Sequence, residues 1–298
     1  MNTNYNFESG FRLANIISII FVLGSLILIF FKGLNFGIDF KGGTLIELRV
    51  ETKNVVISDV RSSFSNMSLG DLNVKEFGSK GDYLIKFERK TFDKDINIKI
   101  IKENVKNSLQ SEVNFRRVEN VGPKVSEELL NSGLLAISLA LGAMLFYIWV
   151  RFEWQFSVGS ILAIFHDVLI TIGLFSLLSL EINLSIVAAV LTIVGYSMND
   201  TVVIYDRIRE NLSKFSSLKI GEISNTSINE TLSRTIITSA TTLLALMSIF
   251  VLGGEILRGF ALAMIIGVII GTYSSIFVAS PILKYLKVSY KTILKENN

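Results

Sequence analysis

The chain has 298 residues, of which 50% are hydrophobic and 18% are charged, and its formal net charge is +3. This composition is typical of a membrane protein, and the small charge, spread along the chain, excludes the basic stripe with which proteins bind nucleic acid. Because the chain contains no cysteine, disulfides, thiolate metal ligands and a cysteine nucleophile are excluded as well.

Six apolar segments are long enough to cross a hydrocarbon core, which takes about 20 helical residues. The predicted spans are residues 13–31, 132–150, 154–180, 182–205, 235–254 and 259–283. No small-residue cleavage pattern follows the first span, so we interpret it as a retained anchor. The sequence therefore predicts a polytopic α-helical membrane protein with six transmembrane helices.

The orientation of these spans follows from the basic residues in the tails and short loops, which stay in the cytoplasm. With the amino terminus inside, eleven such residues lie on the cytoplasmic side and only Arg258 lies on the other. We therefore predict cytoplasmic tails at 1–12 and 284–298 and a cytoplasmic loop at about 206–234. Both termini are then cytoplasmic, and residues 32–126 lie outside.

Residues 32–126 form a separate soluble domain, because their composition changes abruptly to charged residues. Alternating and helical patterns predict strands and helices in the order β-α-β-β-α-β, at 44–50, 58–67, 71–77, 82–88, 95–109 and 112–121. This order is typical of an α+β ferredoxin-like domain. The preceding "GIDFKGGT" lacks the Gly-Lys-Ser/Thr order of a phosphate loop, so we interpret it as a turn into the first strand.

The fourth span contains Asp200, although a carboxylate at the centre of a membrane helix costs about 2.5–3.5 kcal/mol. Such groups usually face a bundle interior and mark an ion path. Thr192, Gly195, Tyr196 and Asn199 share a helix face with Asp200. The alternative is a helix-packing stripe in which Asn199 and Asp200 only form hydrogen bonds with a neighbour.

The fifth span begins with Arg234, which shares a helix face with Thr238. The predicted topology places Arg234 at a depth similar to that of Asp200, so the two opposite charges are expected to compensate each other. The alternative is that Arg234 only anchors its helix at the membrane surface.

The third span contains His166 and Asp167 side by side. A metal site needs more ligands than this single histidine can gather. A proton relay and an interhelical hydrogen bond both remain open.

Six motifs carry a resemblance to a known family: "GIDFKGGT", "VGPKVSEELL", "FHDV", "GYSMNDTVVIYDRIRE", "LSRTIITSATT" and "GFALAMIIGVIIGTYSSIFVASPIL". In this order, and over nearly the whole chain, they resemble the SecD/SecF family of bacterial protein-export membrane subunits. The resemblance implies the resistance-nodulation-division superfamily fold, in which six helices of one half pair with six helices of SecD. It also implies a multi-pass protein of the bacterial cytoplasmic (inner) membrane that is not an enzyme.

The resemblance also implies a function and a site. The expected role is to use the ion gradient, of protons or sodium and with no cofactor, to promote late translocation of preproteins through SecYEG. SecD, SecYEG, unfolded preprotein and membrane lipid are the implied partners. The coupling residues of the family match Asp200 and Arg234, and we consider Asn199, Tyr196, Thr238, His166 and Asp167 as possible supporting polar residues.

Two other classes of function share some of these features. A small-molecule or lipid exporter of the same superfamily would share the ion-coupled helices, but such exporters usually carry larger paired domains outside the membrane. An intramembrane aspartyl protease could use Asp167 and Asp200 as a pair, but its Gly-x-Gly-Asp element is missing.

Overall fold

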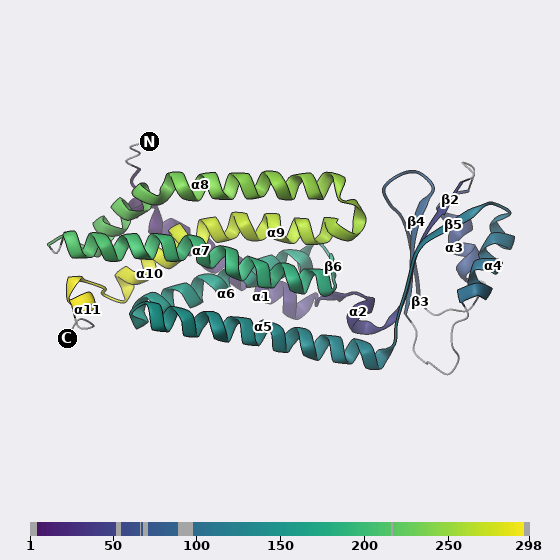
Figure 1. Ribbon diagram of the computed structural model, residues 1–298, viewed down its shortest axis with the longest axis horizontal. Coiled ribbons are helices and arrows are strands. Elements are labelled where there is room, and N and C mark those ends of the chain that lie inside the picture. Colours follow the sequence, from purple (N-terminus) through teal and green to yellow (C-terminus); the bar gives the residue numbers. More distant parts are fainter. Residues whose placement is uncertain are drawn as a thin grey trace. The chain divides into compact units, whose positions relative to one another are not determined.

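The computed structural model describes residues 5–51, 55–65, 67, 71–88, 98–215 and 217–294. The chain forms two compact units. One unit comprises Met1–Asn35 together with Ala136–Asn298, and the other comprises Phe36–Leu135 (Figure 1).

Within the described residues, six helices are long and apolar enough to cross a membrane. They are built on α1 (Phe11–Phe31), α5 (Pro123–Arg151), α6 (Trp154–Leu177), α7 (Leu184–Lys214), α8 (Ile220–Leu252) and α9 (Gly254–Ser274). Short elements adjoin them: η1 (Glu8–Gly10), β1 (Asn35–Phe36), β6 (Glu181–Ile182), η2 (Ser275–Ala279), α10 (Ser280–Tyr285) and α11 (Tyr290–Leu294). Each predicted span falls on one of these helices, the sixth continuing from α9 through η2 into α10.

Residues 206–234, which the sequence analysis treats as a loop, are helical over most of their length. α7 continues to Lys214 and α8 begins at Ile220. The polar extension of α7 is stabilised by ion pairs of Glu210 with Arg207 and Lys214, at the three- and four-residue spacings that bring side chains together on a helix. A helix can therefore continue beyond its apolar part, because charged side chains replace the apolar ones on its surface.

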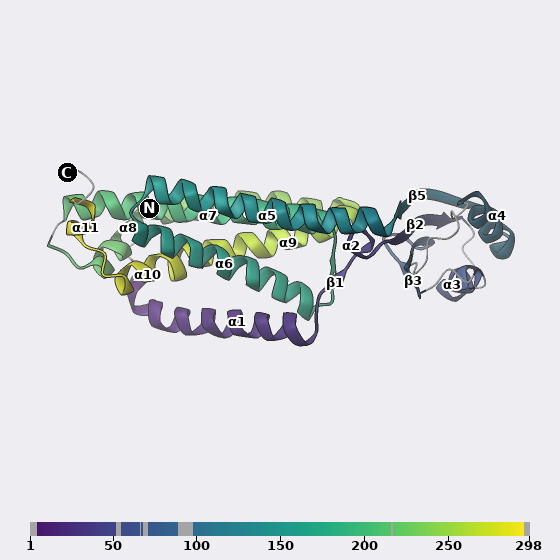
Figure 2. The same ribbon diagram turned by 90° about the horizontal axis from the view of Figure 1, so that it is seen from below.

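Small residues bring the central helices of the bundle close together. A Cβ atom on Gly267 of α9 would lie 2.3 Å from Cγ1 of Ile193 on α7, and one on Gly271 would lie 3.0 Å from Cβ of Ser197. Gly173 makes the same kind of contact between α6 and Ser25 of α1, and Figure 2 shows α1 running along α6. Close approach through small residues is how membrane helices gain packing contacts.

One end of this bundle gathers segments that are far apart in the sequence. The backbone N–H of Phe7 donates to Asn225 Oδ1 near the start of α8, at 2.7 Å. Glu8 forms an ion pair with Lys284 of α10, also at 2.7 Å. The beginning of α1, the beginning of α8 and the end of α10 therefore lie at the same end of the bundle.

The last long helix is interrupted by one π-helical segment, η2 (Ser275–Ala279). The cause lies just beyond it, because Pro281 in the first turn of α10 has no N–H to donate to the carbonyl four residues earlier. Ser280 Oγ donates instead to the carbonyl of Ser275 at 3.0 Å. The wide turn rotates the faces of α9 and α10 relative to each other.

The second unit contains a four-stranded antiparallel sheet with the strand order β3-β4-β2-β5. The strands are β2 (Gly43–Val50), β3 (Asp71–Glu76), β4 (Asp82–Glu88) and β5 (Val113–Val121), and the helices are α2 (Ile38–Lys41), α3 (Ile57–Ser65) and α4 (Ile98–Leu109). Strands and helices follow one another in the predicted order. Residue 66 of the first predicted helix and residues 95–97 of the second lie outside the described residues.

The core of this unit lies between one face of the sheet and the helices α3 and α4. It is formed by alternate residues of β2 and β4 and by residues of both helices: Ile46, Leu48, Val50, Tyr83, Ile85, Phe87, Val60, Phe64, Ile101 and Val105. The chain enters β2 through Gly42 and Gly43, whose φ angles of 79° and 142° are accessible only to glycine without strain. The interpretation of "GIDFKGGT" as a turn into the first strand is thus confirmed.

Candidate functional site

Asp200 lies in the middle of α7 and is 3% exposed. Its Oδ2 atom is buried and has no hydrogen-bond partner among the described residues. A buried polar atom normally has a partner, because leaving it unpaired costs about 1–3 kcal/mol. A carboxyl group in this setting can change its protonation state or hold a cation without breaking an existing hydrogen bond at Oδ2.

The contacts between α7 and α8 show which part of α8 faces Asp200. On one side of it, Tyr196 Oη and Ser239 Oγ are 3.4 Å apart. On the other side, Arg207 Nε donates to Glu230 Oε2 at 2.6 Å. Because the two helices run antiparallel, the stretch of α8 opposite Asp200 lies between residues 230 and 239.

Arg234 lies within that stretch, at the depth that the sequence predicts. Its side chain is exposed, and no ion pair within 4.0 Å joins it to Asp200 among the described residues. Its position opposite Asp200 follows from the hydrogen bonds on either side, at Tyr196 and at Glu230. The structure therefore places the two charges near each other without direct contact.

The other predicted polar residues of α7 lie around Asp200 with different exposures. Thr192, Gly195 and Asn199 are exposed, whereas Tyr196 is half-buried. A Cβ atom on Gly195 would meet no other atom within 4 Å. On this face Asp200 is buried in the bundle and Tyr196 reaches α8, whereas Thr192, Gly195 and Asn199 form a polar stripe on the surface.

Thr238 of α8 is half-buried, and no hydrogen bond joins it to Asp200 among the described residues. Its carbonyl oxygen accepts hydrogen bonds from the hydroxyl groups of Thr241 and Thr242, at 3.0 and 2.9 Å. The neighbouring Ser239 makes the connection between helices instead, because its hydroxyl group also contacts Thr272 Oγ1 of α9 at 2.7 Å.

His166 and Asp167 form a second, fully buried polar cluster between α6, α7 and α9. His166 Nδ1 lies 2.8 Å from Asp167 Oδ1. Asp167 Oδ2 accepts hydrogen bonds from Ser197 Oγ of α7 and, at 2.7 Å, from Ser274 Oγ of α9. The His166 ring stacks on Tyr273, and its Nε2 atom is buried without a partner among the described residues.

Asp167 and Asp200 are therefore in opposite situations. Both oxygens of Asp167 have hydrogen-bond partners on three helices, so this group holds the bundle together. Asp200 has no such partner among the residues that the structure describes. The interhelical hydrogen bond that the sequence left open for Asp167 is present.

Sequence reasoning missed the hydroxyl groups that bind Asp167, namely Ser197 and Ser274. A signal for them exists in the sequence, because Gly267 and Gly271 are spaced like the glycines of close helix pairs, which indicates a close approach of α9 to a neighbour. Within the described residues, no group of three His, Asp or Glu side chains could hold a metal ion.

Comparison with known proteins identifies the family. The model described as "Protein export membrane protein SecD/SecF, C-terminal" matches residues 100–289, and the one described as "SecD/SecF GG Motif" matches residues 27–53. This chain belongs to the SecD/SecF family. The second match includes Gly42 and Gly43, the two glycines with positive φ at the start of β2.

Within the SecD/SecF family, the chain is similar to proteins named SecF over nearly its whole length. It is 44% identical over 281 residues to the protein translocase subunit SecF of Rickettsia bellii, covering 94% of this chain and 92% of the relative. It is 42% identical to the SecF subunit of Cereibacter sphaeroides, covering 91% and 86%. These relatives are named as translocase subunits, and the chain is a translocation component rather than an enzyme.

The fold of this SecD/SecF-family chain is also found in solved structures. The crystal structure of SecDF from Thermus thermophilus, described as a translocon-associated membrane protein, matches it with a TM-score of 0.84 and 35% identity. A SecDF structure in a super-membrane-facing form matches with a TM-score of 0.72 and the same identity. The chain spans 39% of the first SecDF chain. The present chain is a polytopic helical membrane protein.

Proposed function

We propose that this chain is the SecF subunit of the bacterial Sec export machinery. In this role it works with SecD in the inner membrane and uses an ion gradient to promote late translocation of preproteins through SecYEG. The supporting observations are the 42–44% identity to proteins named protein translocase subunit SecF and the similarity to the translocon-associated SecDF.

The observation that carries the coupling mechanism is the unpartnered, buried carboxyl oxygen of Asp200. Binding and release of a proton or sodium ion at Asp200 changes the charge inside the bundle, and the nearby charge of Arg234 on α8 responds to that change. Each charge that crosses the membrane potential supplies about 2.3 kcal/mol per 100 mV. This energy can bias two helix arrangements that differ by a few kcal/mol.

The supporting polar residues have different roles in this proposal. Tyr196 connects α7 to α8 near Asp200, and Asn199 belongs to the stripe that faces away from the bundle. Asp167 and His166 hold α6, α7 and α9 together, so the movement of α7 is transmitted to its neighbours.

SecD is the proposed partner for the polar stripe of Thr192, Gly195 and Asn199. Polar and small residues in a membrane are usually covered by another helix. The apolar, exposed sides of α1, α5 and α8 are suited instead to lipid.

The second unit is proposed to be a ferredoxin-like domain outside the membrane that contacts the unfolded preprotein. The proposed contact with preprotein rests on the family alone, whereas the fold is supported by the strand order β3-β4-β2-β5 with α3 and α4 as the connecting helices. This is the arrangement of a split β-α-β fold.

Neither alternative function is favoured. An aspartyl protease needs two carboxyl groups that share a proton, whereas Asp167 has its hydrogen bonds to His166, Ser197 and Ser274. The relatives that match over the whole chain are translocase subunits rather than exporters of small molecules.

The proposal is tested with Asp200→Asn in membrane vesicles that contain SecD and SecYEG. This change keeps the size of the side chain and removes its titration. We expect folding and SecD binding to be retained and the gradient-dependent stimulation of late translocation to be lost. Asp206→Asn is the matched control, because it makes the same change on the same helix at an exposed ion pair with Arg151. Normal stimulation in the Asp200→Asn complex would show that the coupling proposal is wrong.

The proposed orientation is tested with single cysteines in this cysteine-free chain. Ser79, in the turn between β3 and β4, should react only with a reagent outside the membrane. Ser217, between α7 and α8, should react only from the cytoplasm. The opposite labelling pattern at either position contradicts cytoplasmic termini.

A further inference from the structure

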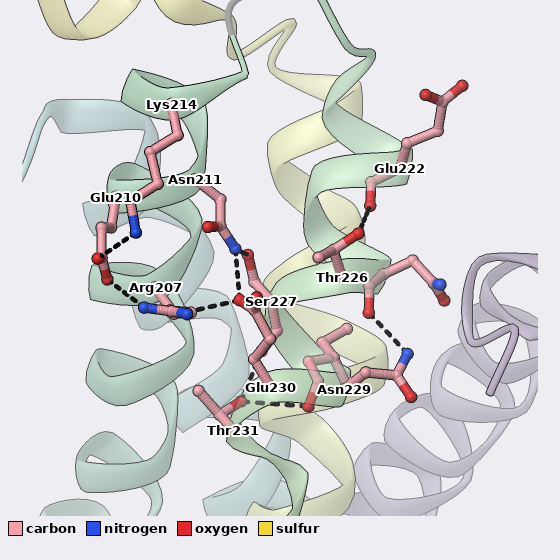
Figure 3. A network of polar contacts seen from close by, with 12 residues as sticks. Arg207, Glu210, Asn211, Lys214, Glu222, Thr226, Ser227, Asn229, Glu230 and Thr231 are labelled. Carbon is pink, nitrogen blue, oxygen red and sulfur yellow. Dashed lines mark hydrogen bonds and ion pairs between the residues drawn. The ribbon is translucent and has the colours of Figure 1, made fainter. Parts of the chain in front are cut away.

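A polar cluster joins the ends of α7 and α8 beyond Asp200, and Figure 3 shows it from close by. Glu230 Oε2 of α8 accepts hydrogen bonds from Arg207 Nε at 2.6 Å and from Asn211 Nδ2 at 2.7 Å. Asn211 Nδ2 also donates to Ser227 Oγ at 3.0 Å. We call these four residues the α7–α8 clamp.

The clamp lies on the same side of each helix as the proposed coupling residues. On α7, Arg207 follows Asp200 by seven residues. On α8, Glu230 precedes Arg234 by four residues. Both spacings return to the same face of a helix. A contact between Arg207 and Glu230 therefore fixes how far α7 is shifted along α8 at the level of Asp200.

The clamp combines a buried pair of neutral residues with a partly exposed ion pair, because the side chains of Arg207 and Glu230 are 32% and 36% exposed. Asn211 and Ser227 are 1% and 0% exposed. Arg207 is also paired with Glu210, and Glu210 is paired with Lys214, so the guanidinium group is held from both sides. Hydrogen bonds that involve a charged partner are stronger than those between neutral groups.

On the other side of Asp200, the two helices are joined much more loosely. The contact there is between the hydroxyl groups of Tyr196 and Ser239 at 3.4 Å, which is long for a hydrogen bond between two hydroxyl groups. Asp200 itself has no partner across the helix pair within the described residues. The hydrogen bonds between α7 and α8, which form the seam between these helices, are therefore short at the clamp and long or missing from Asp200 to Tyr196.

We infer that the α7–α8 clamp is a fixed point that positions Asp200 relative to Arg234 throughout the coupling cycle. Arg207, Asn211 and Glu230 are positioning residues, and the rearrangement that accompanies ion binding occurs in the loose part of the seam. This inference rests on the proposed role of Asp200.

The first test uses a charge exchange in the full chain, assembled with SecD in vesicles. Glu230→Arg breaks the clamp and should lower the gradient-dependent stimulation of translocation at least about fivefold, a modest coupling for residues in contact. The double variant Arg207→Glu with Glu230→Arg, made together with Glu210→Gln so that carboxylates at 207 and 210 do not repel each other, restores opposite charges and should recover stimulation. Asn211 can support the exchanged pair, because its amide offers an acceptor as well as a donor.

The matched control is Asp206→Arg, which makes the same change in charge one residue away from Arg207. It breaks the exposed ion pair with Arg151 and leaves the α7–α8 contacts in place, so stimulation should be normal. Normal stimulation in Glu230→Arg, or no recovery in the double variant, overturns the inference.

The second test asks directly whether the clamp opens, and it uses variants that keep the charges. A cysteine at the buried Ser227 should stay unreactive toward a water-soluble thiol reagent, both with and without a gradient during translocation. A cysteine at the exposed Ser213 on α7 should react under both conditions. If the Ser227→Cys variant reacts only during gradient-driven translocation, the clamp opens and the inference is wrong.

The outcomes also separate this inference from the proposed function. Normal stimulation in Asp200→Asn would show that Asp200 has no coupling role. Loss of stimulation in Asp200→Asn, together with normal stimulation in Glu230→Arg, leaves the coupling role in place and removes only the clamp.

Discussion

The hydrogen bonds of Asp167 make a quantitative prediction for the stability of the bundle. Ser197 and Ser274 donate to the same oxygen of Asp167 from two different helices. Hydrogen bonds between membrane helices contribute about 0.6 kcal/mol on average and up to about 1.7 kcal/mol. We therefore expect Ser197→Ala or Ser274→Ala alone to lower the free energy of unfolding by about 1 kcal/mol.

The double variant should cost more than the sum of the two single changes. After one hydroxyl group is removed, the other still satisfies Oδ2, whereas the loss of both leaves a buried carboxyl oxygen unpaired. The additional cost should be at least about 0.5 kcal/mol, within the range for coupled residues, which brings the total to at least about 2.5 kcal/mol.

The measurement is a reversible denaturation titration of the purified complex in mixed detergent, which gives the free energy of unfolding of each variant. Ser248→Ala is the control, because its hydroxyl group is exposed and donates only to Leu244 of its own helix. A double variant as stable as this control would refute the stabilising role of the Asp167 cluster.

Two further predictions concern the phenol of Tyr83 and the helix packing at Gly267. Burial, reinforced by two nearby carboxylates, raises the pKa of the Tyr83 phenol, so its contribution is fully present below about pH 10 and is lost as the pH rises through the higher folded pKa. Tyr83→Phe should remove this alkaline loss of stability. It should also lower the free energy of unfolding by about 1 kcal/mol at neutral pH, because the phenol donates to the carbonyl of Val55. Thermal melts followed by near-UV circular dichroism measure both effects, and an alkaline loss that is unchanged in the variant contradicts the prediction. Gly267→Leu should destabilise the bundle by about 1–3 kcal/mol through its collision with Ile193, whereas Gly142→Leu, where a Cβ meets nothing within 4 Å, should have little effect in the same denaturation titration.

The features that the sequence predicts well are those set by a single segment. The apolar length of each span and the alternation in β2 and β4 each follow from neighbouring residues. The depth of Asp200 and Arg234 was also predictable, because the connection between their helices is short and the two helices must run antiparallel.

The features that the sequence missed depend on contacts between segments. The hydroxyl groups of Ser197 and Ser274 look ordinary in their own helices, and only the close approach of α7 and α9 at Gly267 and Gly271 brings them to Asp167. The clamp was missed because residues 206–234 were treated as a loop, although Arg207, Glu210 and Lys214 have the spacing of ion pairs on a helix.

The polar stripe of Thr192, Gly195 and Asn199 has a consequence for how much of this protein a cell can hold. Before assembly, these residues lie on an open surface of the bundle, and polar groups that face lipid are unfavourable. Incompletely assembled proteins are continuously removed by cellular proteases. If SecD covers the stripe as proposed, a chain made in excess of SecD carries its own degradation signal, and its abundance is expected to follow the supply of SecD.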